Sequence, residues 1–133
     1  MASQFKIKSS VNSLTFEMSA ENSDSVLAKV SGAGINAEAF VYTFMSKGIG
    51  EFFTNLSSNW KGWQGNIEWS SLEGELKLQA SCDRLGHIFL SVWLTNGAPP
   101  IWEAHTELVL EAGQLEMLAS EALAFESVAF NSA

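Results

Sequence analysis

Cysteine, membrane-length apolar runs and signal-peptide features are almost absent from this sequence. Cys82 is the only cysteine, so an intrachain disulfide cannot form, as is typical of proteins in a reducing cytosol. No apolar run approaches the roughly 18 residues of a membrane-spanning helix. Residues 1–10 lack the apolar segment and cleavage site of a signal peptide. We therefore expect a soluble, cytoplasmic protein that does not bind membranes.

Basic residues are also scarce. The 133-residue chain has 7 Lys and Arg against 15 Asp and Glu, and its net charge is −8. Nucleic-acid binding requires clusters of Lys and Arg, so we expect no nucleic-acid partner. A negative field attracts a basic protein partner, although solubility alone also explains such a charge. Only 17% of the residues are charged, against about 25% in typical soluble domains, which favours partner binding or a homodimer.

Common catalytic and phosphate-binding motifs are missing. No serine lies in a Gly-x-Ser-x-Gly sequence, the Gly32–Gly34 run is too short for a phosphate loop, and Gly48–Gly50 is not followed by Lys-Ser or Lys-Thr. We expect no cofactor and no metal. The sequence favours a non-catalytic protein without excluding an enzyme.

Hydrophobic periodicity predicts the fold. Apolar residues make up 47% of the chain, enough for one domain over residues 1–133 with a substantial core. Alternating apolar and polar residues predict strands, and apolar residues at helical spacing predict helices. The predicted strands are residues 5–8, 14–19, 26–31, 35–44, 67–69, 76–82, 87–96 and 101–111, and the predicted helices are residues 49–59 and 115–123.

The predicted elements run from strands to a helix, and then do so again. The halves are residues 1–59 and 66–126, and Leu14–Glu17 matches Leu76–Gln79 in pattern. This indicates an internal pseudo-repeat, although strand-rich sequences also produce such matches by chance. Short turns between neighbouring strands favour antiparallel pairing. We therefore predict an α+β fold with an antiparallel β-sheet of about eight strands and two helices.

The stretch Trp60-Lys61-Gly62-Trp63-Gln64-Gly65 joins the two halves. Its glycines allow backbone conformations that other residues avoid. Trp60 and Trp63 are candidates for stacking a flat ligand. Clustered tryptophans are, however, more often core or interface anchors, and we expect this pair to anchor the first helix to the second half.

Tight turns in the second half predict a register that gathers polar and aromatic residues on one sheet face. The predicted pairs are Leu78 with Val92, Ser91 with His105, and Trp93 with Glu103. Pairs in such rows lie within contact distance.

His105 is therefore expected between Glu103 and Glu107 on its own strand, close to Phe89 and Trp93. These five residues form a candidate ligand or general-base patch. The alternative is a solvated strand face with a Glu–His ion pair and aromatic packing. Metal binding is disfavoured because metal sites need three or four ligands in defined geometry.

Cys82 and His87 are not expected to form a catalytic dyad. The register places them on opposite faces of the sheet, and a nucleophile must contact its base. A buried cysteine behaves as a small apolar residue. His87 is expected to form a hydrogen bond with Asp83 in the preceding turn.

The second half resembles a family of small bacterial proteins of unknown function with a Trp-x-Gly-Trp motif. The similarity rests on Trp60–Trp63, Trp69–Gly74, Gly86–Ile88 and the final Leu-rich helix, and extends over residues 60–125. It implies a bacterial origin, often in an accessory gene, and transfers no catalytic residues. In size and charge the chain is also similar to immunity proteins, which neutralise toxins.

Two functions follow as hypotheses. The first is a non-catalytic, protein-interaction and immunity-like role with a basic partner. The second is a small-molecule-binding protein or small enzyme that uses the His105 face or a tryptophan-lined pocket.

Overall fold

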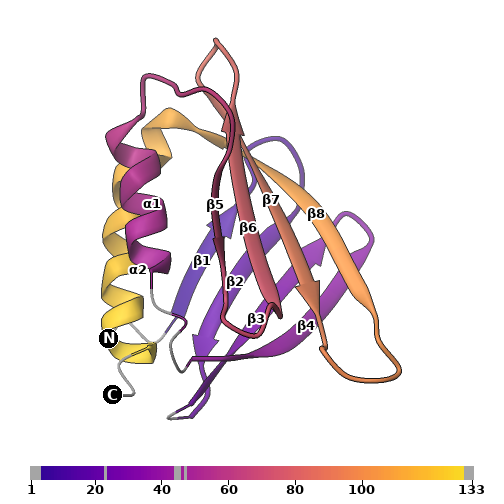
Figure 1. Ribbon diagram of the computed structural model, residues 1–133. Helices are drawn as coiled ribbons and strands as arrows, with labels where there is room; N and C mark the ends of the chain where they lie inside the picture. The colour runs from indigo at the N-terminus through magenta and orange to yellow at the C-terminus, as the bar shows by residue number, and fades with distance from the viewer. Residues whose placement is uncertain (1–3, 23, 44–45, 47, 131–133) are drawn as a thin grey trace.

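The computed structural model describes residues 4–22, 24–43, 46 and 48–130. In this part of the chain, eight strands form two four-stranded antiparallel sheets, and two α-helices accompany them (Figure 1). The predicted α+β class is therefore confirmed, with the strands divided between two sheets. The pseudo-repeat prediction agrees with the observed element order, in which four strands are followed by a helix twice over.

Sheet A contains β1 to β4 in chain order. The strands are Gln4–Lys8 (β1), Thr15–Ala20 (β2), Ser25–Gly32 (β3) and Ile35–Tyr42 (β4). Alternation places one apolar face inward: Phe16, Met18 and Val26 are fully buried. β4 ends at Tyr42 rather than at the predicted Phe44, which lies outside the described residues.

Sheet B contains β5 to β8, again in chain order. The strands are Ile67–Ser70 (β5), Leu76–Cys82 (β6), His87–Thr95 (β7) and Glu103–Glu111 (β8). Leu78 lies opposite Val92, as the sequence predicted.

The predicted register between β7 and β8 is wrong by two residues. Trp93 pairs with His105 rather than Glu103, and Ser91 pairs with Glu107 rather than His105. The reason is the connecting loop, in which the Asn96 side chain accepts a hydrogen bond from the Trp102 amide. Because of this loop, β8 begins at Glu103, and Trp102 lies outside the strand.

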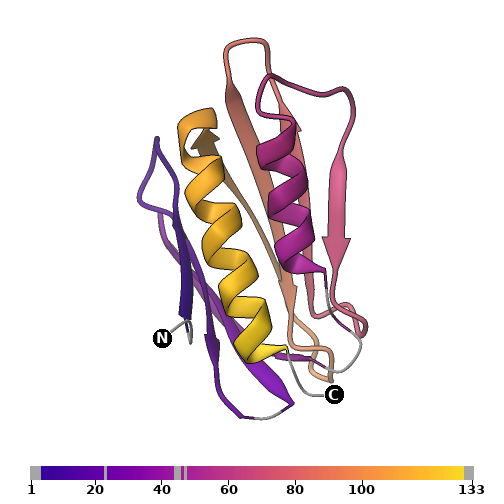
Figure 2. The same ribbon diagram turned by 90° about the vertical axis from the view of Figure 1, so that its left-hand side faces the viewer.

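Two antiparallel helices lie side by side between β1 and β5 (Figure 2). These two strands are edge strands of their respective sheets. Helix α1 spans Ile49–Ser58, and α2 spans Leu115–Ala129 after a short 3₁₀ turn, η1, at Ala112–Gln114. The predicted apolar stripe of α1 is buried: Ile49, Phe52, Phe53 and Leu56. The helices therefore cover the side of the core that the sheets leave open.

Gly50 allows α1 to approach α2 closely. A Cβ atom at this position would lie 3.1 Å from the Cα atom of Leu123 and 2.7 Å from its Cδ2 atom. The α2 residue Glu126 accepts hydrogen bonds from the Gly48 amide at 3.1 Å and the Gly50 amide at 2.7 Å. The start of α1 is thus held by a side chain of α2.

Hydrogen bonds also join the two sheets at their ends. The Tyr42 amide at the end of β4 donates to the Glu75 carboxylate before β6. The Ser10 amide after β1 donates to the Val109 carbonyl of β8 at 2.8 Å. These links fix the position of one sheet relative to the other.

Neither helix in the described part of the chain combines the length and the hydropathy that crossing a membrane requires.

Candidate functional site

The outer side chains of sheet B form the surface on which most predicted site residues lie. We call this surface the sheet B face. It comprises Glu68 and Ser70 of β5, Lys77, Gln79 and Ser81 of β6, His87, Phe89, Ser91, Trp93 and Thr95 of β7, and Glu103, His105, Glu107, Val109 and Glu111 of β8. All alternate with residues that point towards the core.

A stacked pair of rings occupies one row of this face. The Trp93 and His105 rings are parallel within 6°, and their centroids are 4.2 Å apart. The Lys77 ammonium lies over the Trp93 ring at 5.5 Å from its centroid. A cation over an indole face is attracted by the ring quadrupole. Trp93 is therefore held between a cation on β6 and an imidazole on β8.

Carboxylates surround the stacked pair. Glu103 and Glu107 lie two residues before and after His105 on β8, and all three are exposed. Glu107 faces Ser91, and the same row continues through Gln79 to Glu68. The Gln79 amide donates to the Glu68 carboxylate at 2.8 Å, so the carboxylate at the β5 end of this row has a partner on the same face.

Phe89 lies farther from His105 than the sequence indicated. It pairs with Ser81 on one side and Val109 on the other, in a row separated from Trp93 by Ser91. Phe89 and Val109 are half-buried. The face therefore has an aromatic row, a polar row with Glu107, and a smaller apolar row.

In the described part of the chain, no three His, Cys, Asp or Glu residues are grouped so that they could hold a metal ion. His105 has the ring of Trp93 against its own ring face. His105 is otherwise exposed, so it lies on an open sheet face.

Trp60 and Trp63 are in different environments. Trp60 is 56% exposed, and the Lys61 ammonium lies 5.4 Å from its ring centroid. Trp63 is half-buried, and its amide donates to the Cys82 sulfur at 3.3 Å. The Cys82 thiol in turn donates to the Trp63 carbonyl at 3.3 Å. Trp63 thus anchors the joint to β6, whereas the predicted anchoring role of Trp60 is not seen.

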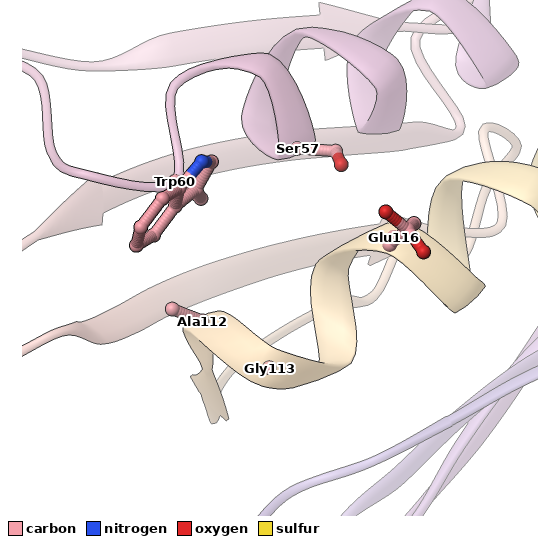
Figure 3. A pocket seen from close by; sticks show the side chains of 5 residues that line it. All are labelled: Ser57, Trp60, Ala112, Gly113 and Glu116. Atoms are coloured by element: carbon pink, nitrogen blue, oxygen red, sulfur yellow. The ribbon is translucent and has the colours of Figure 1, made fainter.

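A shallow pocket of about 420 Å³ lies beside Trp60, between the end of α1 and the start of α2. It is lined by Ser57, Trp60, Ala112, Gly113 and Glu116. Figure 3 shows the indole of Trp60 on one side and the Glu116 carboxylate across from it, near the Ser57 hydroxyl. The sequence indicated Trp60 but not the residues of η1 and α2 that complete this pocket.

His87 belongs to a polar cluster at the opposite end of β7 from Trp93. Its Nδ1 atom is 2.9 Å from the Asp83 carboxylate, as the sequence predicted, and its Nε2 atom is 3.9 Å from Glu111. The Ser10 hydroxyl donates to the same Glu111 carboxylate at 3.0 Å. Hydrogen bonding to Asp83 raises the pKa of His87, and the same bond lowers the pKa of Asp83.

The two outer faces differ in charge. The sheet B face has four Glu residues and one Lys. On the outer face of sheet A, Lys6, Lys8 and Lys29 outnumber Glu17 and Glu38. Of the two outer faces, the sheet B face is therefore the negatively charged one.

The comparisons identify a family but no activity. Residues 4–128 match the family of unknown function DUF6228. The match covers most of the chain, so the chain belongs to this family, and the resemblance to a family without an assigned function is confirmed at that level. No curated protein matches the chain.

Proposed function

We propose that this DUF6228 protein binds a basic protein partner through the sheet B face and does not catalyse a reaction. The observation that carries this proposal is the stack of the half-buried Trp93 ring and the exposed His105 ring on a face with four carboxylates and one lysine. Aromatic side chains supply contact area at protein interfaces. Surrounding carboxylates attract a basic partner and orient it.

The open, four-stranded surface of the face supports a macromolecular partner. The stacked rings come from neighbouring strands, and Glu103 and Glu107 extend the same surface along β8. A sheet face of this kind presents a broad contact area rather than an enclosed small-molecule cavity. An immunity-like role, in which the protein covers a basic surface of a toxin, is one form of this function.

The first experiment compares two double variants with the same net charge. Glu103→Gln with Glu107→Gln changes the sheet B face, and Glu17→Gln with Glu38→Gln changes the outer face of sheet A. Each protein is immobilised and exposed to an extract of cells that carry the gene, in about 50 mM salt. The retained partner is identified and its dissociation constant is measured.

The sheet B variant should bind the partner about tenfold more weakly, because two surface charge interactions are lost. The sheet A variant should bind as the wild type does. Affinity should also fall as salt is raised, because the salt screens exposed charges. The proposal is wrong if the wild type retains no basic protein, or if both variants weaken binding equally.

A further inference from the structure

The pocket beside Trp60 has the chemistry of a site for an organic cation, and none of its lining residues belongs to the sheet B face. Its three informative groups are the exposed indole of Trp60, the exposed carboxylate of Glu116 and the hydroxyl of Ser57. These groups come from both helices and from the joint after α1. The pocket therefore exists only because the two helices are antiparallel neighbours.

The Trp60 ring already attracts a cation in this structure. The Lys61 ammonium lies 5.4 Å from the ring centroid, within the distance at which the indole quadrupole attracts positive charge. Lys61 is exposed and sits on a flexible stem. It shows what kind of group this ring accepts.

The helix ends also contribute to the charge preference. The last turn of α1 contains no basic residue, so the partial negative charge at its C-terminal end is not offset by its own side chains. At the start of η1, the Glu111 side chain accepts a hydrogen bond from the Gln114 amide in a capping box. The partial positive charge at the start of η1 and α2 is therefore offset by Glu111 and, within the pocket, by Glu116.

We propose that this pocket binds a guanidinium or alkylammonium group, with the cation against the Trp60 ring and its N–H groups directed to the Glu116 carboxylate and the Ser57 hydroxyl. The volume of about 420 Å³ accommodates a group of amino-acid size. An anion is disfavoured by Glu116 and by the net charge of −8. The cation has two sources, a free metabolite or an arginine or lysine side chain of a polypeptide.

The test uses N-acetyl-arginine amide as the probe and N-acetyl-citrulline amide as its neutral isostere. Binding is followed by the shift of the Trp60 indole N–H signal in a ¹H–¹⁵N spectrum, assigned by its loss in Trp60→Ala. Trp60 is 56% exposed, so this variant should fold. The arginine derivative should bind at least about tenfold more tightly than the neutral isostere.

Three variants and one control variant separate the effect of direct contact from that of general charge. Glu116→Gln should weaken binding about two- to fivefold, whereas the control Glu121→Gln, exposed on the same helix, should change it little. For Trp60→Ala, followed by calorimetry, the expected loss is about three- to fivefold. Lys61→Gln should strengthen binding about twofold, because it removes a competing like charge.

Peptide and free probes then distinguish the two sources. The peptide probe is short and has one arginine as its only charged residue. If it binds more than about tenfold more tightly than N-acetyl-arginine amide, the site is assigned to polypeptide side chains. Equal affinity assigns the site to a free cation. The proposal fails if arginine and citrulline derivatives bind equally. It also fails if Glu116→Gln and Glu121→Gln have the same effect, or if Lys61→Gln abolishes binding. None of these outcomes depends on the sheet B face.

Discussion

Glu126 is placed where the rules for an isolated helix disfavour it. It lies in the last turn of α2, where a negative side chain opposes the helix dipole. Its carboxylate instead accepts the Gly48 and Gly50 amides at the start of α1, at 3.1 and 2.7 Å. Gly48 provides no side-chain cap of its own. We predict that Glu126→Ala destabilises the fold by removing the cap of a neighbouring helix.

The size of the effect follows from the two hydrogen bonds. Loss of a helix cap costs about 0.5–2 kcal/mol, and a hydrogen bond to a charged group contributes about 1.5–3 kcal/mol. These terms overlap because they describe the same two contacts. The better helix propensity of alanine offsets a few tenths of a kcal/mol. We expect Glu126→Ala to lower the free energy of unfolding by about 2 kcal/mol, and Glu126→Gln, which keeps one acceptor, by about 1 kcal/mol.

Urea unfolding followed by circular dichroism measures this difference. The matched control is Glu121→Ala, which removes the same charge from an exposed position of α2 and should cost less than about 0.5 kcal/mol. The m-value should stay constant, because the area exposed on unfolding is unchanged. Equal midpoints for Glu126→Ala and Glu121→Ala would refute the assignment of Glu126 as the cap of α1.

The polar cluster and the tryptophan joint give two further predictions. The pKa of His87 is raised from 6.5 and that of Asp83 is lowered from 3.8. The stabilising contribution of His87 is therefore complete below its unfolded pKa and lost as pH rises through the folded one, whereas that of Asp83 is complete above its unfolded pKa and lost as pH falls through the folded one. Thermal melts should show a stability difference between wild type and His87→Ala that is largest between the unfolded pKa of Asp83 and the unfolded pKa of His87, and that shrinks above neutral pH. A difference independent of pH would contradict the ion pair. Trp63→Ala should cost about 2 kcal/mol in urea unfolding, because a half-buried indole and its contact with Cys82 are lost, whereas Trp60→Ala should cost less than about 1 kcal/mol; the reverse order would restore the anchoring role to Trp60.

Local patterns predicted the strands and their faces well. Leu78 and Val92 lie opposite each other on the buried face, because the turn between β6 and β7 is tight and alternation leaves one apolar face to bury. The same reasoning gave the wrong partner for His105. The Asn96 side chain organises the next loop through the Trp102 amide, and a local pattern of alternation contains no information about such a loop.

The candidate site was predictable in its residues but not in its grouping. Trp93 and His105 were both identified, yet their stacking depends on the observed register. Trp60 was identified as a ligand candidate, but Glu116 is distant in sequence and joins it only where the two helices meet. Neighbours of this kind are produced by packing, and no local signal marks them.

The amino-acid sequence by itself determined the kinds of elements in this protein and the face that each one buries, because both follow from the spacing of apolar residues along a regular backbone. The tertiary structure decided everything that depends on two elements meeting. Gly50 has a low intrinsic helix propensity, but it allows the close approach of α2. Glu126 reads as a poor C-terminal residue, but it caps α1. Glu103, Glu107 and Glu111 share one side of β8 by alternation alone, but Glu68 of β5 joins their face only after the four strands pair.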